Sequence, residues 1–320
     1  MKAIVQKAYG SPDVLDVREV DEPAIADDQV LVRMHASSIN PVEFYRVAGP
    51  VFARIANGLL KPKQAGLGAD LAGRVEAVGQ GIVGLEPGDE VFGTSGASWA
   101  EYAPAREVRL VRKPANVSFE EAASVPIAGL TALQALRDKG RVQPGQKVLI
   151  NGASGGVGTF AVQIAKALGA DVTAVCSTGN VESVRSLGAD RVVDYTREDF
   201  TRLGERHDLM LDVAGSRPFR QFARVLTPKA IVVLVGGKMN RGLGPLPHLA
   251  GTRLSALVRS QTVVSFLAQI NKEDLGVLAE LMESGKVQPV IDRRYELSQI
   301  REALRYFGEG HARGKVVITV

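Results

Sequence analysis

The spacing of apolar residues along the chain changes near residue 120. Before that point, short apolar runs are broken by Pro, Gly and Asp, as in AIVQKAYG, QVLVRMHASSIN and LAGRVEAVGQGIVGLEPGDEVFG. Short strands separated by such turn residues favour an antiparallel barrel or sandwich. A similar pattern of short apolar runs occurs again after about residue 285 and ends in KVVITV. We therefore expect an N-terminal β domain over residues 1–120 that residues 285–320 complete.

After Ser118 the sequence pattern predicts helices that alternate with strands, and these strands are apolar throughout. Examples of these strands are KVLINGA, DVTAVC and AIVVLVGG. Because strands of this kind are buried on both faces, the pattern predicts an α/β domain with a doubly wound parallel sheet over residues 121–284. Segment 238–262 is less regular, and we expect a long loop with a helix there.

A glycine-rich turn joins one of these strands to a helix. The strand KVLI runs directly into NGASGGVG and then into a helical pattern. Apolar residues fall on one face of the expected helix: Val157, Ala161, Ile164, Ala165 and Leu168. Backbone N–H groups at such a helix start can receive a pyrophosphate, which predicts a dinucleotide site. Its candidate residues are Ser154, Gly155, Gly156 and Val157.

The fingerprint G-x-G-x-x-G is present in this turn with one change. Ala153 replaces the first glycine, whereas Gly155 and Gly158 remain. Because these two glycines allow the backbone to approach a ligand and the helix to approach the strand, we keep the prediction. A tight turn without a ligand is the alternative.

The end of the next strand bears on which dinucleotide would bind. An NAD site places Asp or Glu about 20 residues into the unit, on the ribose hydroxyls. Here DVTAVC leads into Ser177 and Thr178, and no acid follows before Glu182. Two hydroxyls can donate to a 2′-phosphate that a carboxylate would repel, so NADP(H) is the favoured cofactor. Against this, the first cation is Arg185, and Ser177 or Asn180 could simply cap the next helix.

Composition excludes several classes of protein. Charged residues make up 23% of the chain, and 39 Lys and Arg against 35 Asp and Glu give a net charge of +4 that is not clustered. This balance suits an anionic small ligand, and we expect no nucleic-acid partner. No run approaches the roughly 18 apolar residues of a membrane span, so we expect no membrane partner and a cytoplasmic protein. The single Cys176 excludes an internal disulfide and a Cys-based zinc cluster.

Many ordered motifs resemble one family over nearly the whole chain. They include SSINPVEFYRVAG, AASVPIAGLTALQAL, NGASGGVG, CSTGNVESVRSLGADRVVDY and GHARGKVVITV. The chain resembles the zinc-independent branch of the medium-chain dehydrogenase/reductase superfamily, the quinone oxidoreductases and their relatives, with motifs most similar to the reticulon-interacting oxidoreductase type. The resemblance implies a GroES-like antiparallel β-barrel beside a Rossmann domain, with an active site in the cleft between them. It also implies a homodimer; no transit peptide is expected.

The resemblance also bears on metal and on chemistry. Zinc-dependent members have a Cys near the position of Ser38 and a His-Glu pair where this chain has Ala69 and Asp70, so we expect no metal. Without a Lewis acid, an unactivated ketone lacks its usual electrophilic help. A quinone or an α,β-unsaturated carbonyl needs less, because it accepts hydride at carbon and spreads the charge onto oxygen. The expected substrate is therefore a small quinone or enone, held against the nicotinamide.

The resemblance implies catalytic roles for Asn40 and Tyr45. Asn40 would donate its amide near the nicotinamide ribose or to the substrate oxygen, and Tyr45 would hydrogen-bond a developing enolate. The alternatives are an Asx-turn and a half-buried barrel aromatic. Glu43 stands where the family usually has Asp and receives no chemical role. Phe52 replaces a proton-donating tyrosine of related enoyl reductases, which lowers the expectation of an enoyl-thioester reductase.

Further cofactor contacts are implied only by the resemblance. They are Asn40, Thr131, Tyr195, Gly236, Gly237, Phe266, Ala312, Arg313 and Gly314. Thr131 could instead bond backwards within its helix, and Arg313 could be a solvated surface charge. We expect solvated or structural roles for the histidines His35, His207, His248 and His311. A low-turnover NADPH-binding protein with a partner- or RNA-binding role is the alternative from another class.

Overall fold

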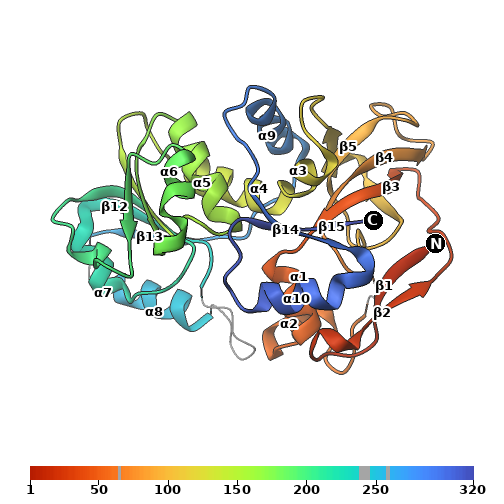
Figure 1. The fold of residues 1–320 in the computed structure, drawn as a ribbon, viewed down its shortest axis with the longest axis horizontal. Helices are drawn as coiled ribbons and strands as arrows, with labels where there is room; N and C mark the ends of the chain where they lie inside the picture. The colour runs from red at the N-terminus through yellow and green to blue at the C-terminus, as the bar shows by residue number, and fades with distance from the viewer. Residues whose placement is uncertain (64–65, 238–245, 257–259) are drawn as a thin grey trace. The chain divides into compact units, whose positions relative to one another are not determined.

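The fold is that of a computed structural model, which describes residues 1–63, 66–237, 246–256 and 260–320. The chain forms two compact units (Figure 1). The first unit comprises residues 1–130 and 269–320, and the second comprises residues 131–268. The expected domain limits after residues 120 and 284 stay a prediction, because compactness alone does not establish which segment folds independently.

A parallel sheet forms the centre of the second unit. Its strands are β8 (Lys147–Asn151), β9 (Asp171–Cys176), β10 (Arg191–Asp194), β11 (His207–Asp212), β12 (Leu226–Leu234) and β13 (Thr262–Ser265). They lie in the order β10-β9-β8-β11-β12-β13, and each neighbouring pair is parallel. Strand order reverses between β8 and β11, so their carboxyl ends form a topological switch point. The expected doubly wound sheet is confirmed.

Helices alternate with these strands in the second unit. They are α5 (Gly156–Ala167), α6 (Val181–Ser186), α7 (Phe219–Phe222) and α8 (Leu246–Ala256), preceded by α4 (Pro126–Gln134), which begins in the first unit, and a π-helical turn (Ala135–Lys139). Helix α8 lies in the irregular segment 238–262. The long loop expected there falls partly on residues 238–245 and 257–259, outside the described residues.

Helix α5 is buried more widely than its sequence pattern indicated. The expectation was one apolar face, but every residue from Gly158 to Ala165 is buried, including Thr159 and Gln163. The helix contacts β8 and β9 and also the π-helical turn, so protein covers it on more than one side. An apolar periodicity marks the most buried side of a helix and does not exclude burial of the others.

A mainly antiparallel sheet forms the first unit. Its strands are β3 (Gln29–Ser38), β4 (Asp70–Val78), β5 (Glu90–Thr94), β6 (Tyr102–Arg106), β7 (Leu110–Arg112), β14 (Ile291–Glu296) and β15 (Lys315–Thr319), and β1 (Lys2–Gln6) pairs with β2 (Leu15–Glu19) in a separate ladder. The order is β14-β15-β3-β4-β5-β7, with β6 also on β3. Strand β15 pairs with β3 in the register Val317↔Ser38. The strand predicted at the end of the chain, after residue 285, therefore joins the N-terminal sheet.

Helices and apolar cores complete the first unit. Its remaining helices are α1 (Pro41–Ala48), α2 (Val51–Asn57), α3 (Phe119–Ala123), α9 (Lys272–Glu283) and α10 (Ile300–Gly308). One core gathers Ile4, Trp99 and Ile318, so it joins segments from both ends of the chain. The second unit has its own core around Phe219 and Phe222. Within the described residues, no helix is both long and apolar enough to cross a membrane.

Candidate functional site

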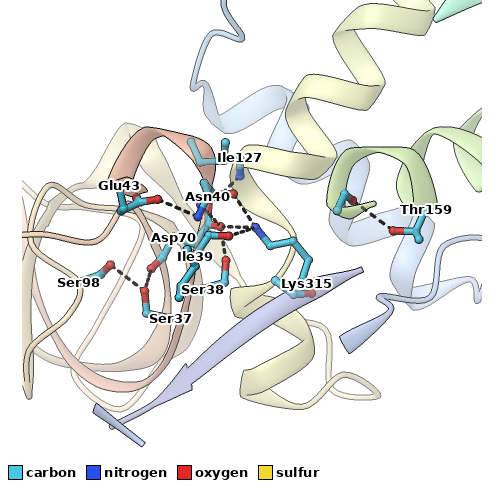
Figure 2. Close-up of polar contacts among 12 residues, drawn as sticks. Ser37, Ser38, Ile39, Asn40, Glu43, Asp70, Ser98, Ile127, Thr159 and Lys315 are labelled. Carbon is cyan, nitrogen blue, oxygen red and sulfur yellow. Dashed lines mark hydrogen bonds and ion pairs between the residues drawn. The ribbon is translucent and has the colours of Figure 1, made fainter. Parts of the chain in front are cut away.

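Five buried polar side chains meet in the first unit (Figure 2). They are Ser38 at the end of β3, Asn40 and Glu43 at the start of α1, Asp70 at the start of β4 and Lys315 at the start of β15. Each is at most 3% exposed. We call this group the Asp70 cluster. Because buried charges are costly unless they are paired and hydrogen-bonded, its contacts show what the cluster does.

Asp70 is the centre of this cluster. Its Oδ2 accepts hydrogen bonds from Ser38 Oγ at 2.5 Å and Asn40 Nδ2 at 2.8 Å, and Lys315 Nζ lies 3.4 Å away. Its Oδ1 accepts the backbone N–H of Ile127 at 2.9 Å. Ile127 is the second residue of α4, where the helix dipole favours a negative charge. The carboxylate therefore anchors the start of the helix that carries Thr131.

Asn40 is held by the Asp70 cluster at both ends of its amide. Its Nδ2 donates to Asp70, and its Oδ1 accepts from Lys315 Nζ at 2.5 Å. Among the residues that the structure describes, the second N–H hydrogen of the amide has no acceptor. The expected catalytic role of Asn40 stays a prediction. Its amide also links Asp70 to Lys315, a structural role that the sequence did not indicate.

Glu43 received no chemical role from the sequence, yet its surroundings in this cluster favour the protonated form of its carboxyl group. Its Oε2 accepts the backbone N–H of Asn40 at 2.8 Å, half of a helix capping box. Burial, followed by the neighbouring charge of Asp70, raises the pKa of Glu43 to about 7. The pattern N-x-x-E before an apolar run was the signal that could have located it. Lys315 had no comparable local signal.

Tyr45 lies on α1, one turn after the start of the helix. Its half-buried ring packs edge-on against Phe44 and Phe52, with centroid distances of 5.8 and 5.3 Å. Burial raises the pKa of the Tyr45 phenol, so the hydroxyl stays protonated at neutral pH and is a potential donor. Phe52 stands where related enoyl reductases have a proton-donating tyrosine. Here its ring packs against Tyr45 and helps to hold the Tyr45 ring in place.

The glycine-rich turn lies where the sequence predicted it, between β8 and α5. Gly155 is the N-cap residue, and α5 starts at Gly156. A Cβ atom on Gly158 would lie 2.1 Å from the carbonyl oxygen of Gly152, so the turn requires glycine there. The first N–H groups of a helix have no intrahelical acceptor, which leaves those of Gly156 and Val157 suited to an anion. Thr159 Oγ1 donates to Gly156 O at 3.2 Å (Figure 2).

The segment after β9 is expected to discriminate NADP(H) from NAD(H). The structure changes the interpretation of one of its two hydroxyl groups, that of Thr178. Thr178 Oγ1 donates to the carboxylate of Asp194 at 2.6 Å, because β10 runs parallel to β9 and places Asp194 opposite Cys176. An acid therefore does lie beside Thr178, although none precedes Glu182 along the chain. This corrects the premise that both hydroxyls are available to a 2′-phosphate, since the proton of Thr178 is already donated.

A cation that the order of residues along the chain did not indicate lies near the same segment. Arg197 Nε lies 3.5 Å from Asp194 Oδ2, the carboxylate oxygen that also accepts from Thr178. Ser177 Oγ accepts from Asn180 Nδ2 at 3.0 Å, and among the described residues its own proton has no acceptor. The following Tyr195 is 53% exposed, so it is open to contact.

The expected residues at the ends of β12 and β13 lie close to backbone from other loops. A Cβ on Gly236 would lie 2.4 Å from Val213 O, and Gly237 Cα approaches the position of a Cβ on Gly215 to 2.5 Å. Phe266 follows β13, and Lys139 Nζ lies 5.7 Å from the centre of its ring. Backbone packing requires glycine at position 236, whether or not a ligand also approaches it.

The run Ala312 to Gly314 precedes β15 in the first unit. Gly314 has φ of +103°, and a Cβ there would lie 2.3 Å from Val290 O. The backbone N–H of Arg313 donates to Asp292 at 3.0 Å, and its side chain is exposed. The cofactor roles expected for this run, and for Thr131 on α4, stay predictions.

Two family models match the chain: an alcohol dehydrogenase GroES-like domain over residues 26–134 and a zinc-binding dehydrogenase over residues 187–318. A 2-methylene-furan-3-one reductase of Solanum lycopersicum is 36% identical over 99% of this chain and 79% of its own length. An NADPH-dependent alkenal/one oxidoreductase, chloroplastic, of Arabidopsis thaliana is 33% identical over 99% and 79%. The solved quinone oxidoreductase from Coxiella burnetii has a TM-score of 0.88 and 31% identity, covering 100% of this chain and 99% of its own.

The chain belongs to the medium-chain dehydrogenase/reductase superfamily, within its quinone oxidoreductase-like group. It is an oxidoreductase, as the resemblance implied, and its fold is the GroES-like and Rossmann combination expected above.

The zinc of some medium-chain dehydrogenases can be tested against the Asp70 cluster, and the residues do not fit it. Ser38 donates its proton to Asp70, and the ammonium of Lys315 lies within the same group of side chains. A resident cation of this kind opposes a second one through charge repulsion. No group of three His, Cys, Asp or Glu side chains suited to a metal occurs in the parts of the chain that the structure describes.

Proposed function

We propose that this oxidoreductase transfers hydride from NADPH to a quinone or an activated α,β-unsaturated carbonyl. The observation that carries the proposal is the glycine turn at the head of α5, beside the switch point of a doubly wound sheet. The names of an alkenal/one oxidoreductase, a furanone reductase and a quinone oxidoreductase among similar proteins support the acceptor class.

The second unit has a set of residues that suits a dinucleotide. Gly158 is required for the turn geometry, and the N–H groups at the start of α5 would bind the pyrophosphate together with Ser154 and Gly155. Ser177, Thr178 and Tyr195 would lie on the adenosine side. Gly236, Gly237 and Phe266 would lie on the nicotinamide side. Bound NADPH would supply the hydride, and the remaining chemistry falls to the protein's polar groups.

Two residues of the first unit are proposed to act on the acceptor. Hydride addition to the β-carbon of an enone moves an electron pair onto the carbonyl oxygen, which then takes up a proton. The Tyr45 phenol, protonated at neutral pH, would donate to that oxygen. Asn40 would act through its one remaining amide hydrogen. For a quinone, hydride transfer gives a hydroquinone anion, whose oxygen water can protonate to give the hydroquinone.

Preference for NADPH over NADH is part of this proposal and rests on Ser177 and Arg197. Ser177 keeps a proton that can be donated to a 2′-phosphate, and Arg197 offsets the charge of Asp194. Fluorescence titration with both cofactors tests the preference, which equal or tighter NADH binding would refute. Ser177→Asp should then reverse it, because the new carboxylate would repel the phosphate.

Three finer features also remain proposals: turnover without zinc, a cytoplasmic location and a homodimer. The first follows from the ammonium of Lys315 within the Asp70 cluster. Activity that survives a chelator, together with elemental analysis showing no stoichiometric zinc, would support it.

A matrix of acceptors tests the proposed function directly. NADPH and NADH are each combined with quinones, alkenals and enoyl thioesters, and oxidation of the cofactor is followed. We expect turnover with quinones or alkenals. Faster turnover with thioesters would favour an enoyl-thioester reductase. Tight NADPH binding without turnover would favour the low-turnover binding protein.

A further inference from the structure

A second buried carboxylate, outside the Asp70 cluster, lies at the switch point of the parallel sheet. Asp212 ends β11, and the register places it beside Asn151 at the end of β8. It is fully buried. Its Oδ1 accepts from Asn151 Nδ2 at 2.8 Å and from the backbone N–H of Gly215 at 3.0 Å. Asp212 is therefore held in a fixed orientation by groups from two strand ends.

The other oxygen of Asp212 holds a histidine. His248, on α8, has its Nε2 atom 2.8 Å from Asp212 Oδ2, and its side chain is 16% exposed. Since a carboxylate only accepts hydrogen bonds, Nε2 carries a proton, and in the neutral ring Nδ1 is an acceptor. Within the described part of the chain, Nδ1 has no hydrogen-bond partner. The pair thus presents an oriented acceptor on a partly exposed side chain.

The location of the pair indicates which part of a dinucleotide could reach it. A dinucleotide lies across the switch point, with its pyrophosphate at the glycine turn after β8. The expected adenosine-side residues Ser177 and Tyr195 follow β9 and β10. The opposite half of the ligand would therefore lie over the ends of β11 and β12. His248 is on that side: its ring lies 3.1 Å from the position of a Cβ on Gly215, which Gly237 also approaches.

We propose that the Asp212–His248 pair binds a hydroxyl of the ribose on the nicotinamide side of the cofactor. A ribose hydroxyl is a donor that matches the Nδ1 acceptor, and Asp212 fixes the ring in the tautomer that leaves Nδ1 free to accept. This inference rests on the proposed function, because it requires that the chain binds a nicotinamide dinucleotide.

Three ligands that share the adenosine half separate this role from a structural one. NADPH has both riboses and the nicotinamide ring; 2′-phospho-ADP-ribose lacks only the ring; 2′,5′-ADP also lacks the second ribose and the phosphate that carries it. For His248→Ala, we expect the Kd of the first two to rise about tenfold, the effect of one hydrogen bond, with 2′,5′-ADP unchanged. Calorimetric titration measures all three.

Two further variants keep the test decisive. His248→Gln can still donate to Asp212 and guards against loss of packing; it should weaken the same two ligands. Tyr195→Ala, on the expected adenosine side, should weaken all three ligands by a similar factor.

Four results would overturn the inference. The first is that both His248 variants weaken the binding of all three ligands equally, and the second is that they weaken the binding of none. The third is that they weaken the binding of NADPH alone. The fourth is that the wild-type chain does not bind NADPH. The third would mean contact with the nicotinamide ring instead of the ribose. The fourth would also remove the proposed function, whereas the first three leave it intact.

Discussion

The ammonium of Lys315 donates to the amide oxygen of Asn40 across 2.5 Å, joining residues 275 positions apart in the chain. The same ammonium donates to Ile39 O at 3.2 Å and lies 3.4 Å from Asp70. A single buried cation therefore holds the residue expected to act on the substrate and compensates the carboxylate that anchors α4.

Removal of this cation should destabilise the protein strongly. Lys315→Met leaves Asp70 as an unpaired buried charge, and we expect a loss of about 3–5 kcal/mol in the free energy of unfolding, measured with urea. Lys166→Met is the matched control, because its partner Asp190 is 44% exposed; there we expect at most about 1 kcal/mol. Adding Asp70→Asn to Lys315→Met should recover part of the loss. Equal effects of the two lysine variants would contradict the role assigned to Lys315.

Glu43 should make stability depend on pH. Its pKa is raised from an ordinary value of 4.5 to about 7 in the folded chain, so the folded state binds more protons than the unfolded state between these values. Its contribution is therefore present below about pH 4.5 and is lost as the pH rises to about 7, by at most about 3 kcal/mol. Glu43→Gln should lack this loss. Unfolding at pH 5, 6, 7 and 8 compares the two proteins, and parallel profiles would show that Glu43 does not titrate in this range.

Tyr45→Phe should separate two classes of acceptor. An enone requires a donor for its developing enolate, whereas a quinone product is readily protonated by water. We expect kcat/KM for an enone to fall by less than the roughly 100-fold that one oxyanion donor supplies at a preorganised dry site, because Tyr45 is only half-buried. A quinone measured in parallel is the control. An equal fall for both acceptors would assign Tyr45 to packing alone.

The two glycines of the phosphate turn should respond differently to a methyl group. At Gly158 the new Cβ would lie 2.1 Å from Gly152 O, whereas at Gly155 it would lie 3.7 Å from the same atom. Gly158→Ala should therefore lower the thermal midpoint and weaken NADPH binding. Gly155→Ala should leave the thermal midpoint close to that of the wild type and weaken binding only. Similar thermal midpoints for both variants would mean that the turn adjusts to a side chain at Gly158.

Cys176 should be unreactive until the second unit unfolds. Its side chain is buried at the end of β9, and burial, together with the charge of Asp194, raises the pKa of the thiol to about 11. The thiolate, which is the reactive form, is therefore scarce at neutral pH. A thiol reagent such as DTNB should label the chain only at the rate of unfolding. Rapid labelling of the native protein would contradict this.

The spacing of glycines predicted the turn at α5, and apolar patterns along the chain were sufficient to predict the parallel sheet and the strands that follow residue 285. They reflect local preferences and burial, which repeat every two or three to four residues. The polar contacts were not predictable in this way. Asp70 meets Lys315 across 245 positions, and Asp194 meets Thr178 through strand register. His248, on α8, reaches Asp212 at the end of β11. Such pairs depend on the completed fold, and neither partner has a periodic signal.

The split of the first unit into residues 1–130 and 269–320 has a consequence during synthesis on the ribosome. Residues 131–268 emerge as one stretch while β15 is still unmade. Until β15 arrives, the end of β3 from Ala36 to Ser38 has an unpaired edge, and Asp70 has no ammonium beside it. An open strand edge can pair with other chains. The nascent chain is therefore exposed to misassembly at this edge until Val317, Ile318 and Thr319 of β15 can pair with β3.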